Sequence, residues 1–418
     1  MILRISIFLI LFSSSYSFAQ KDYALTIMDS LCSERYDGRG YVNNGDVRAA
    51  DFIVRELKDI GLVPLEGREF EQHYTLNVNT FPGRMLVVID QDTLKPGGNY
   101  LVNSMSGSAK GSWRIKEINP ANVEEILSQP NAIKTINENG AIPVFNFVDL
   151  KDKELLSKLK DYALQSMQIS PVVWIEKNKQ MFSVGRAEAK FPMITINAED
   201  FKGGSSIELD IENNYVKKHK TKNIIAYIPG KRKRKQIVFS AHYDHLGRMG
   251  SDAYFPGAND NASGVAMLLS LAKYYAENPP KYSIVFCFFS GEEAGLVGSR
   301  YFVNNPWLKL KRIKFVLNVD IMGGASKGIT LVNGTVHKRA FNRFVKINEE
   351  KQYLPLIKKR GPTANSDHFF FSQMGVPAFF IYSMGTVSNY HDIYDTAANT
   401  PLNRFNEVQN LLIDFVGN

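Results

Sequence analysis

The stretch SAHYDHLG, residues 240–247, places two histidines and an aspartate within four positions. This stretch begins at the end of the apolar run QIVFSA, residues 236–241, which has the composition of a buried strand. Imidazole and carboxylate groups this close together can bind a metal ion or transfer protons. A polar turn after a strand would give the same pattern by accident, because motifs this short recur without function. The rest of the chain has to distinguish the two interpretations.

Four more segments carry histidine or carboxylate side chains just after an apolar run or at the start of a helix. Taken singly, each has a structural alternative, such as a helix cap or a solvated loop. Taken together they indicate a metal site, because converging carboxylates repel one another unless cations neutralise them. The residues are Asp260 in GANDNASG, Glu292 and Glu293 after YSIVFCFFSG, Asp320 after IKFVLNV, and Tyr390 and His391 after VPAFFIYS.

The candidate ligands are imidazoles and carboxylates without a thiolate, and this set suits zinc. A bridging carboxylate such as Asp260 would hold two metals about 3.5 to 4 Å apart, the separation found in two-metal hydrolytic sites. Asp244 lies two positions beyond His242, so on a strand both side chains point the same way. We therefore expect two Zn²⁺ per chain, with Asp244 orienting the imidazole of His242.

From residue 222 onward, near-continuous apolar runs alternate with helical patterns such as NASGVAMLLSLAKYYAEN. This alternation predicts an α/β fold with a mainly parallel mixed sheet and helices on both faces. Ligands of such sheets bind beyond the carboxyl ends of the strands, where the candidate residues lie. The two apolar runs NIIAYIPG and QIVFSAH are predicted to form a hairpin with KRKRK, residues 231–235, as a solvated turn.

Ahead of that region, residues 46–62 have the apolar spacing of an amphipathic helix that ends at Gly61. Over about residues 90–215 the alternation of helical and strand-like apolar patterns becomes weaker. The length of this region suits a smaller β-rich domain inserted into another. The predicted division is a signal peptide over 1–19, the N-terminal part of the main domain over 20–89, the insert over 90–215, and the part of the main domain that carries the candidate metal site over 216–418.

Residues 1–19 combine one arginine, a short apolar stretch and a small-x-small ending at Ser17 to Ala19. This pattern predicts a signal peptide and export to the periplasm or the exterior. The apolar stretch is too short for a membrane anchor, which needs about 20 residues. The chain has a net charge of +8 and contains the basic run KRKRK. No aromatic residues alternate with these basic residues, so no nucleic-acid partner is expected. With two cysteines no disulfide framework is expected; Cys287 reads as a buried apolar residue, and its pairing with Cys32 stays open.

Six motifs in order resemble the co-catalytic di-zinc exopeptidases, a family that includes bacterial leucyl aminopeptidases, glutamate carboxypeptidases and glutaminyl cyclases. The resemblance covers about residues 22–75, with YDGRG, and 222–418. The insert resembles weakly a protease-associated domain. The motifs are SAHYDHLG, GANDNASG, FFSGEEAGLVGSR, LNVDIMG, NSDHFFF and YHDIYDT.

The resemblance implies a role for each candidate residue. His242 and Asp320 would bind one zinc, Glu293 and His391 the other, and Asp260 would bridge them. Glu292 would be the general base, and Tyr390 would steady the oxyanion or simply pack. Asp367 and His368 would support the wall of the site, and His245 would lie at its rim. His73, His219 and His337, outside every motif, would have no chemical role.

The function these roles imply is that of a secreted zinc aminopeptidase acting on peptide substrates. A glutaminyl cyclase or a carboxypeptidase on the same fold is the first alternative. Such cyclases usually carry tryptophan before the late histidine, where this chain has Tyr390. A non-catalytic receptor-like module is the second alternative, but such proteins lose metal ligands that are all present here.

Overall fold

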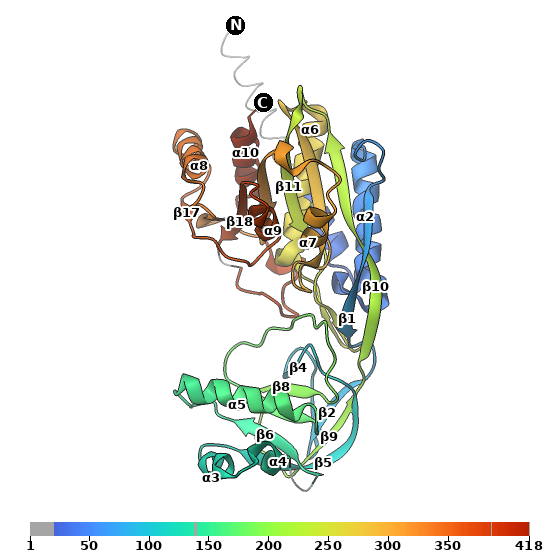
Figure 1. The fold of residues 1–418 in the computed structure, drawn as a ribbon, viewed down its shortest axis with the longest axis vertical. Coiled ribbons are helices and arrows are strands. Elements are labelled where there is room, and N and C mark those ends of the chain that lie inside the picture. The colour runs from blue at the N-terminus through green and yellow to red at the C-terminus, as the bar shows by residue number, and fades with distance from the viewer. Residues whose placement is uncertain (1–20, 138–139, 386, 418) are drawn as a thin grey trace.

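The computed structural model describes residues 21–137, 140–385 and 387–417. The chain forms two eight-stranded sheets, each with its own helices, which lie at opposite ends of an elongated molecule (Figure 1). The predicted signal peptide, residues 1–19, lies outside the described residues. Among the described residues no helix combines the length and the apolar character that crossing a bilayer requires.

The first sheet has a parallel centre, and antiparallel pairs join the outer strands to it on both sides. Strands β14, β11, β15 and β18 run parallel, β1, β10 and β16 are added antiparallel, and β17 pairs parallel with β16. The prediction of a mainly parallel mixed sheet is therefore confirmed. In spatial order the strands are β1 (Glu71–Thr80), β10 (Asn214–Ile228), β14 (Tyr282–Phe289), β11 (Arg232–His242), β15 (Ile313–Val319), β18 (Ala378–Met384), β16 (Gly328–Val332) and β17 (Ile357–Lys359).

Alternate residues of the central strands bury themselves on opposite faces of this sheet. On β14, Phe286 and Phe288 pack into the core that contains α2, α6, α8 and α10, whereas Val285 and Cys287 pack into the core that contains α7 and α9. Burial on both faces explains why the strands read as unbroken apolar runs. The helices are α2 (Gly45–Ile60), α6 (Ser263–Glu277), α7 (Val297–Asn304), α8 (Lys338–Lys351), α9 (His368–Gln373) and α10 (Phe405–Val416).

Several local predictions can be compared with these elements. The helix predicted over 46–62 is α2, which ends at Gly61 with a φ of 91°, a conformation that favours glycine. Cys287 is fully buried as expected, and both it and Cys32 are free thiols, so the two do not pair. The predicted hairpin of 223–230 with 236–242 is wrong, because β14 lies between β10 and β11. The exposed residues 232–235 nevertheless form the solvated start of β11, and the exposed residue 231 directly precedes it.

The second sheet is built from residues 85–211. Its strands β5 to β8 run parallel in sequence order, and the others pair antiparallel. Helices α3 (Val123–Ser128), α4 (Ala132–Ile136) and α5 (Lys153–Ser166) share a core with one face. In spatial order the strands are β3 (Asp92–Leu94), β2 (Met85–Ile89), β9 (Ser206–Ile211), β5 (Ala109–Ile118), β6 (Ile142–Asn146), β7 (Val172–Glu176), β8 (Met193–Asn197) and β4 (Tyr100–Val102).

The chain enters and leaves the second sheet at adjacent points, since Thr80 at the end of β1 pairs with Asn214 at the start of β10. Strand β2 belongs to the second sheet, although it precedes the predicted boundary at residue 90. Adjacent entry and exit points are what an inserted domain requires, and the division into a catalytic domain and an insert remains our proposal.

The free face of the second sheet shares an apolar core with a small hairpin of the first unit. This hairpin, β12 (Gly247–Met249) and β13 (Ala253–Phe255), contributes Met249 and Phe255 to that core. The two units are therefore packed together directly beside the segment that follows SAHYDHLG. Residues 21–31 form a further helix. The short helical turns include η1 (Glu34–Arg39), η2 (Val42–Asn44), η4 (Ala258–Ala262), η5 (Leu310–Arg312) and η6 (Ala397–Asn399).

Candidate metal centre

The carboxyl ends of the parallel strands deliver the predicted ligands to one edge of the first sheet. His242 ends β11, Asp320 directly follows β15, and Glu293 lies in the turn after β14. His391 lies in the loop after β18, and Asp260 lies in η4 at the entry to α6. Because these strands run in the same direction, residues far apart in the sequence meet at this edge.

Asp260 lies between the two histidines of the site. Its Oδ1 is 3.2 Å from His242 Nε2, and its Oδ2 is 3.1 Å from His391 Nε2. Asp320 Oδ1 is 3.3 Å from His242 Nε2, and Glu293 Oε2 is 3.3 Å from His391 Nε2. The five residues thus form two groups, His242 with Asp320 and His391 with Glu293, joined by one carboxylate.

The far nitrogen of each imidazole faces a backbone carbonyl. His242 Nδ1 is 3.1 Å from the carbonyl oxygen of Asp244, and His391 Nδ1 is 3.0 Å from that of Phe182. A carbonyl only accepts hydrogen bonds, so both Nδ1 atoms carry the proton and donate it. In the neutral rings each Nε2 then presents a lone pair to carboxylate oxygens, which are also acceptors. His391 Nε2 is buried and forms no hydrogen bond. A cation, either a proton added to Nε2 or a metal ion, is therefore needed between these acceptors.

The electrostatics of the cluster lead to the same requirement. Burial lowers the pKa of His391, but the charge of Glu293 and the contact with Asp260 outweigh burial and raise the pKa to about 11. A site that draws a proton this strongly is short of positive charge. Imidazole nitrogen and carboxylate oxygen without thiolate are ligands that zinc takes. The residues therefore fit zinc, with Asp260 able to serve two ions.

The two neighbouring glutamates experience different environments. Burial raises the pKa of Glu292 well above its usual value, with further contributions from Glu293 and Asp320 and an opposing one from His242. Burial also acts on Glu293, but the adjacent His391 outweighs it and lowers the pKa to about 2. When the environments of two neighbouring carboxylates shift their pKa values in opposite directions, the one with the lower pKa commonly stays charged and the one with the higher pKa commonly transfers the proton. Glu292 is suited to exchange a proton, and Glu293 to remain ionised.

Asp244 lies beside His242 as predicted, but its carboxylate makes other contacts. Its Oδ1 and Oδ2 accept the backbone N–H groups of Glu292, at 3.2 Å, and Glu293, at 3.3 Å, and Oδ2 also accepts the hydroxyl of Tyr41. The carboxylate is 3.8 Å from His242 Nδ1, farther than the carbonyl of the same residue. Asp244 therefore orients the imidazole through its backbone and fixes the glutamate turn through its side chain.

Tyr390 stacks on the imidazole of His391, with ring centroids 3.9 Å apart and an angle of 15° between the planes. Its side chain is 38% exposed, so the ring borders the site and is open to solvent. This position allows contact with a bound substrate, and the oxyanion role suggested by the sequence stays a prediction.

The sequence-based placement of His245 at the rim is wrong. This residue is fully buried, and its Nδ1 is 2.8 Å from Glu293 Oε1. Its Nε2 is also buried and has no hydrogen-bond partner. Ligand atoms of His245, Asp260 and Glu293 lie within 4.8 Å of one another, which makes this histidine a further candidate ligand. Strand alternation ends at His242, so the pattern along β11 could not indicate the direction of a side chain three residues later.

The NSDHFFF motif contributes to the site through a residue that the sequence did not single out. Ser366 donates a hydrogen bond of 2.9 Å to Asp320 Oδ2, which holds that carboxylate in place. Asp367 and His368 are both buried; burial raises the pKa of Asp367 to about 7 and lowers that of His368 to about 4. Their support of the wall of the site stays a prediction. His219 contacts Asp46, away from the ligands.

The loop that carries Asp260 is held by two residues for which the sequence suggested no role. The fully buried Arg39, in YDGRG, donates to the carbonyls of Gly257 and Asp260 at 2.7 and 3.2 Å. Asp395, in YHDIYDT, accepts the backbone N–H groups of Asn259 and Asp260 at 2.8 and 3.0 Å. Both motifs thus act by fixing the backbone of the central carboxylate, and only the tertiary structure shows this.

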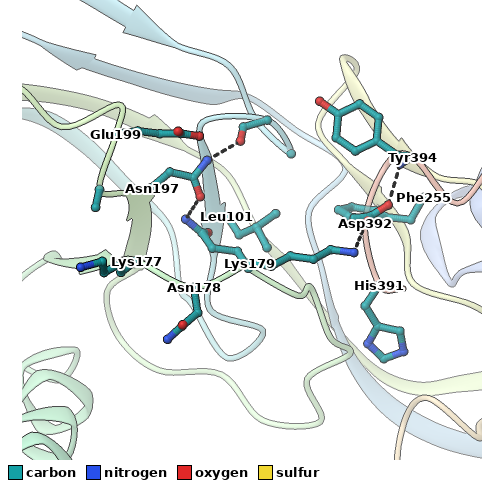
Figure 2. Close-up of a pocket in the computed structure, with 14 residues that line it drawn as sticks. Leu101, Lys177, Asn178, Lys179, Asn197, Glu199, Phe255, His391, Asp392 and Tyr394 are labelled. Carbon is teal, nitrogen blue, oxygen red and sulfur yellow. Dashed lines mark hydrogen bonds and ion pairs between the residues drawn. The ribbon is translucent and has the colours of Figure 1, made fainter. Parts of the chain in front are cut away.

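A pocket of about 630 Å³ opens beside His391 between the two units (Figure 2). The first unit contributes Phe255, His391, Asp392 and Tyr394, and the second contributes residues from the segments 97–101, 177–180 and 197–199. Polar side chains such as Lys179, Gln180 and Glu199 line the side of the second unit. A ligand in this pocket would contact both units at once.

Parts of the chain are similar in sequence to curated peptidases. Among curated proteins, a probable leucine aminopeptidase of Arthroderma otae is 30% identical over 215 residues, which are 47% of this chain and 56% of that protein. A vacuolar membrane protease of Kluyveromyces lactis is 36% identical over 110 residues, 26% of this chain and 11% of that protein. The chain therefore spans only part of the length of these relatives.

Solved structures share the fold across both units. The zinc aminopeptidase BSAP of Bacillus subtilis superposes with a TM-score of 0.68 at 18% identity, over 94% of this chain and 92% of that one. A peptidase M28 precursor of Shewanella amazonensis gives a TM-score of 0.66 at 15% identity, over 96% and 98% of the two chains. Residues 223–416, which contain all five predicted ligands, match the sequence model of Peptidase family M28. Over this region the chain is similar to peptidase family M28.

Proposed function

We propose that this protein is an exported aminopeptidase that uses two zinc ions to hydrolyse peptides. The observation that carries the proposal is the position of Asp260, whose two oxygens face two separate imidazole and carboxylate pairs. His242 and Asp320 would hold one ion, Glu293 and His391 the other, and His245 is an additional candidate ligand. Export rests on the sequence of residues 1–19.

The proposed roles in hydrolysis follow from the positions of the groups. Bound zinc would polarise the scissile carbonyl and lower the pKa of water. Glu292, with its raised pKa, would accept a proton from the attacking water and return it to the leaving amine. Asp244 holds the backbone of Glu292, so the proton acceptor is fixed beside the ligands. The pocket between the two units would accommodate the peptide.

Metal content gives the first test of this proposal. We expect close to two zinc ions per chain by metal analysis and loss of activity on treatment with a chelator, because no cation remains to separate the clustered carboxylates. Added zinc is expected to restore activity. A content of one ion, together with cyclisation of N-terminal glutamine, would favour the glutaminyl cyclase alternative.

Substrate preference gives the second test. We expect hydrolysis of amino-acid chromogenic amides that carry a free α-amine, and at least about tenfold less of their N-acetylated counterparts, since one discriminating polar contact is worth about 1.4 kcal/mol or more. Peptides labelled at both ends report which terminus is removed. Equal cleavage of blocked and free substrates would contradict the aminopeptidase proposal, and release of C-terminal residues would favour a carboxypeptidase.

A further inference from the structure

We infer that the segment 179–182 of the second unit positions His391, so that the insert controls one of the two proposed zinc sites. The inference rests on the proposed two-zinc centre. It concerns residues of the second unit, which lies outside the region matched to the peptidase family.

Phe182 fixes both the backbone and the side chain of His391. The carbonyl of Phe182 accepts the Nδ1–H of the imidazole at 3.0 Å, and its N–H donates to the carbonyl of His391, also at 3.0 Å. The partner of the nitrogen that does not bind metal sets the tautomer and the direction of a histidine ligand. For His391 this partner comes from the second unit.

The conformation of His391 needs such external contacts. Its φ is 53°, in the left-handed region that residues other than glycine rarely adopt. Such conformations persist only where the surrounding structure over-determines them. The loop that contains His391 lies between β18 and η6 and belongs to no described strand or helix, so ladder hydrogen bonds do not hold it.

Phe182 is itself held in place on the first unit. Its buried ring stacks on Phe255 of β13, with centroids 4.7 Å apart and planes 16° apart. Lys179 adds a polar clamp on the same loop, since its ammonium pairs with Asp392 (Figure 2). The same ammonium donates to the carbonyl of Ser388 at 3.1 Å. Residues on both sides of His391 are thus tied to the segment 179–182.

The other imidazole of the centre has no such dependence. His242 Nδ1 donates to the carbonyl of Asp244, only two residues away and within the first unit. Weakening the clamp should therefore affect the zinc held by His391 and Glu293 and leave the zinc held by His242 and Asp320 in place. This asymmetry separates a positioning role from a general contribution to folding, which would affect both ions.

The test is chelator competition on the full zinc-loaded chain, comparing Lys179→Met with Lys177→Met. Lys177 is a matched control, because it lines the same pocket two residues away and, among the described residues, forms its ion pair with the exposed Asp149. We expect Lys179→Met to lower the affinity for one of the two ions by about 10- to 100-fold, the usual effect of losing an outer contact of a metal ligand. Lys177→Met should match the wild type, and Lys179→Arg should restore most of the affinity.

Three results would overturn the inference: unchanged affinity for both ions in Lys179→Met, equal weakening of both ions, or equal effects of Lys177→Met and Lys179→Met. Thermal unfolding of the metal-free variants provides the folding control, and we expect no difference between the two. Failure of the proposed function would appear separately, as a wild-type chain that binds fewer than two zinc ions before any variant is made.

Discussion

Replacing Glu292 by glutamine is expected to lower kcat by about 10² to 10⁴ while the zinc content stays that of the wild type. The carboxamide is nearly isosteric with the carboxylate but cannot take up a proton at neutral pH. Its backbone N–H still binds Asp244, so the geometry of the turn should survive. Steady-state kinetics on metal-analysed protein gives the measurement, and KM should change little because the lost contact acts in the transition state.

The matched control for this change is Glu277→Gln, which makes the same substitution at the exposed C-terminal end of α6, outside the site and the pocket. We expect its kcat to stay within about threefold of the wild type, because general-base loss and not reduced negative charge accounts for effects of 10² or more. Near-normal turnover of Glu292→Gln at full zinc occupancy would show that another group accepts the proton.

The second large effect is expected for Asp260→Ala, which should reduce binding of both zinc ions and lower kcat/KM by about 10³-fold or more. The estimate follows from the several kcal/mol that metal ions contribute to transition-state stabilisation, at 1.36 kcal/mol per factor of ten. Arg39 and Asp395 bind the backbone of Asp260, so the loop should keep its conformation without the carboxylate. Metal analysis combined with kinetics at increasing zinc concentrations gives the measurement.

Glu293→Ala is the informative comparison for Asp260→Ala. The carboxylate of Glu293 contacts His391 and His245, whereas that of Asp260 contacts both His242 and His391. Loss of Glu293 should therefore weaken one ion, and excess zinc should restore part of the activity. Equal zinc content in the two variants would argue against a bridging role for Asp260. Full zinc occupancy in Asp260→Ala would exclude that residue as a ligand.

The sequence by itself determined the five candidate ligands, the glutamate beside them and the class of fold that brings them together. Parallel strands whose apolar runs end at His242, Asp320 and the glutamate pair must deliver those side chains to the same edge, whatever the order of the strands. Asp260 at the start of a predicted helix and His391 in the loop after VPAFFIYS were singled out in the same way, and the six ordered motifs implied the role of each residue. The amphipathic helix α2 and the burial of Cys287 were equally predictable, because period and polarity are local properties of the chain.

The order of strands was decided only by the tertiary structure. The predicted hairpin fails because β14, which follows later in the chain, is inserted between β10 and β11. Strand pairing depends on packing over the whole sheet, and the short connection between two apolar runs does not specify it. The same holds for His245, which lies beyond the last residue of β11, where the side-chain alternation no longer applies.

Tertiary structure also supplied the contacts that involve backbone atoms. The carbonyl of Phe182 holds His391, the carbonyl of Asp244 holds His242, and Arg39 holds the carbonyl of Asp260. Every residue has a carbonyl, so a sequence pattern cannot mark the ones that a fold will use. The sequence therefore determined the chemical groups of the site, whereas the tertiary structure decided which backbone atoms orient them and joined the second unit to one of the two proposed metal positions.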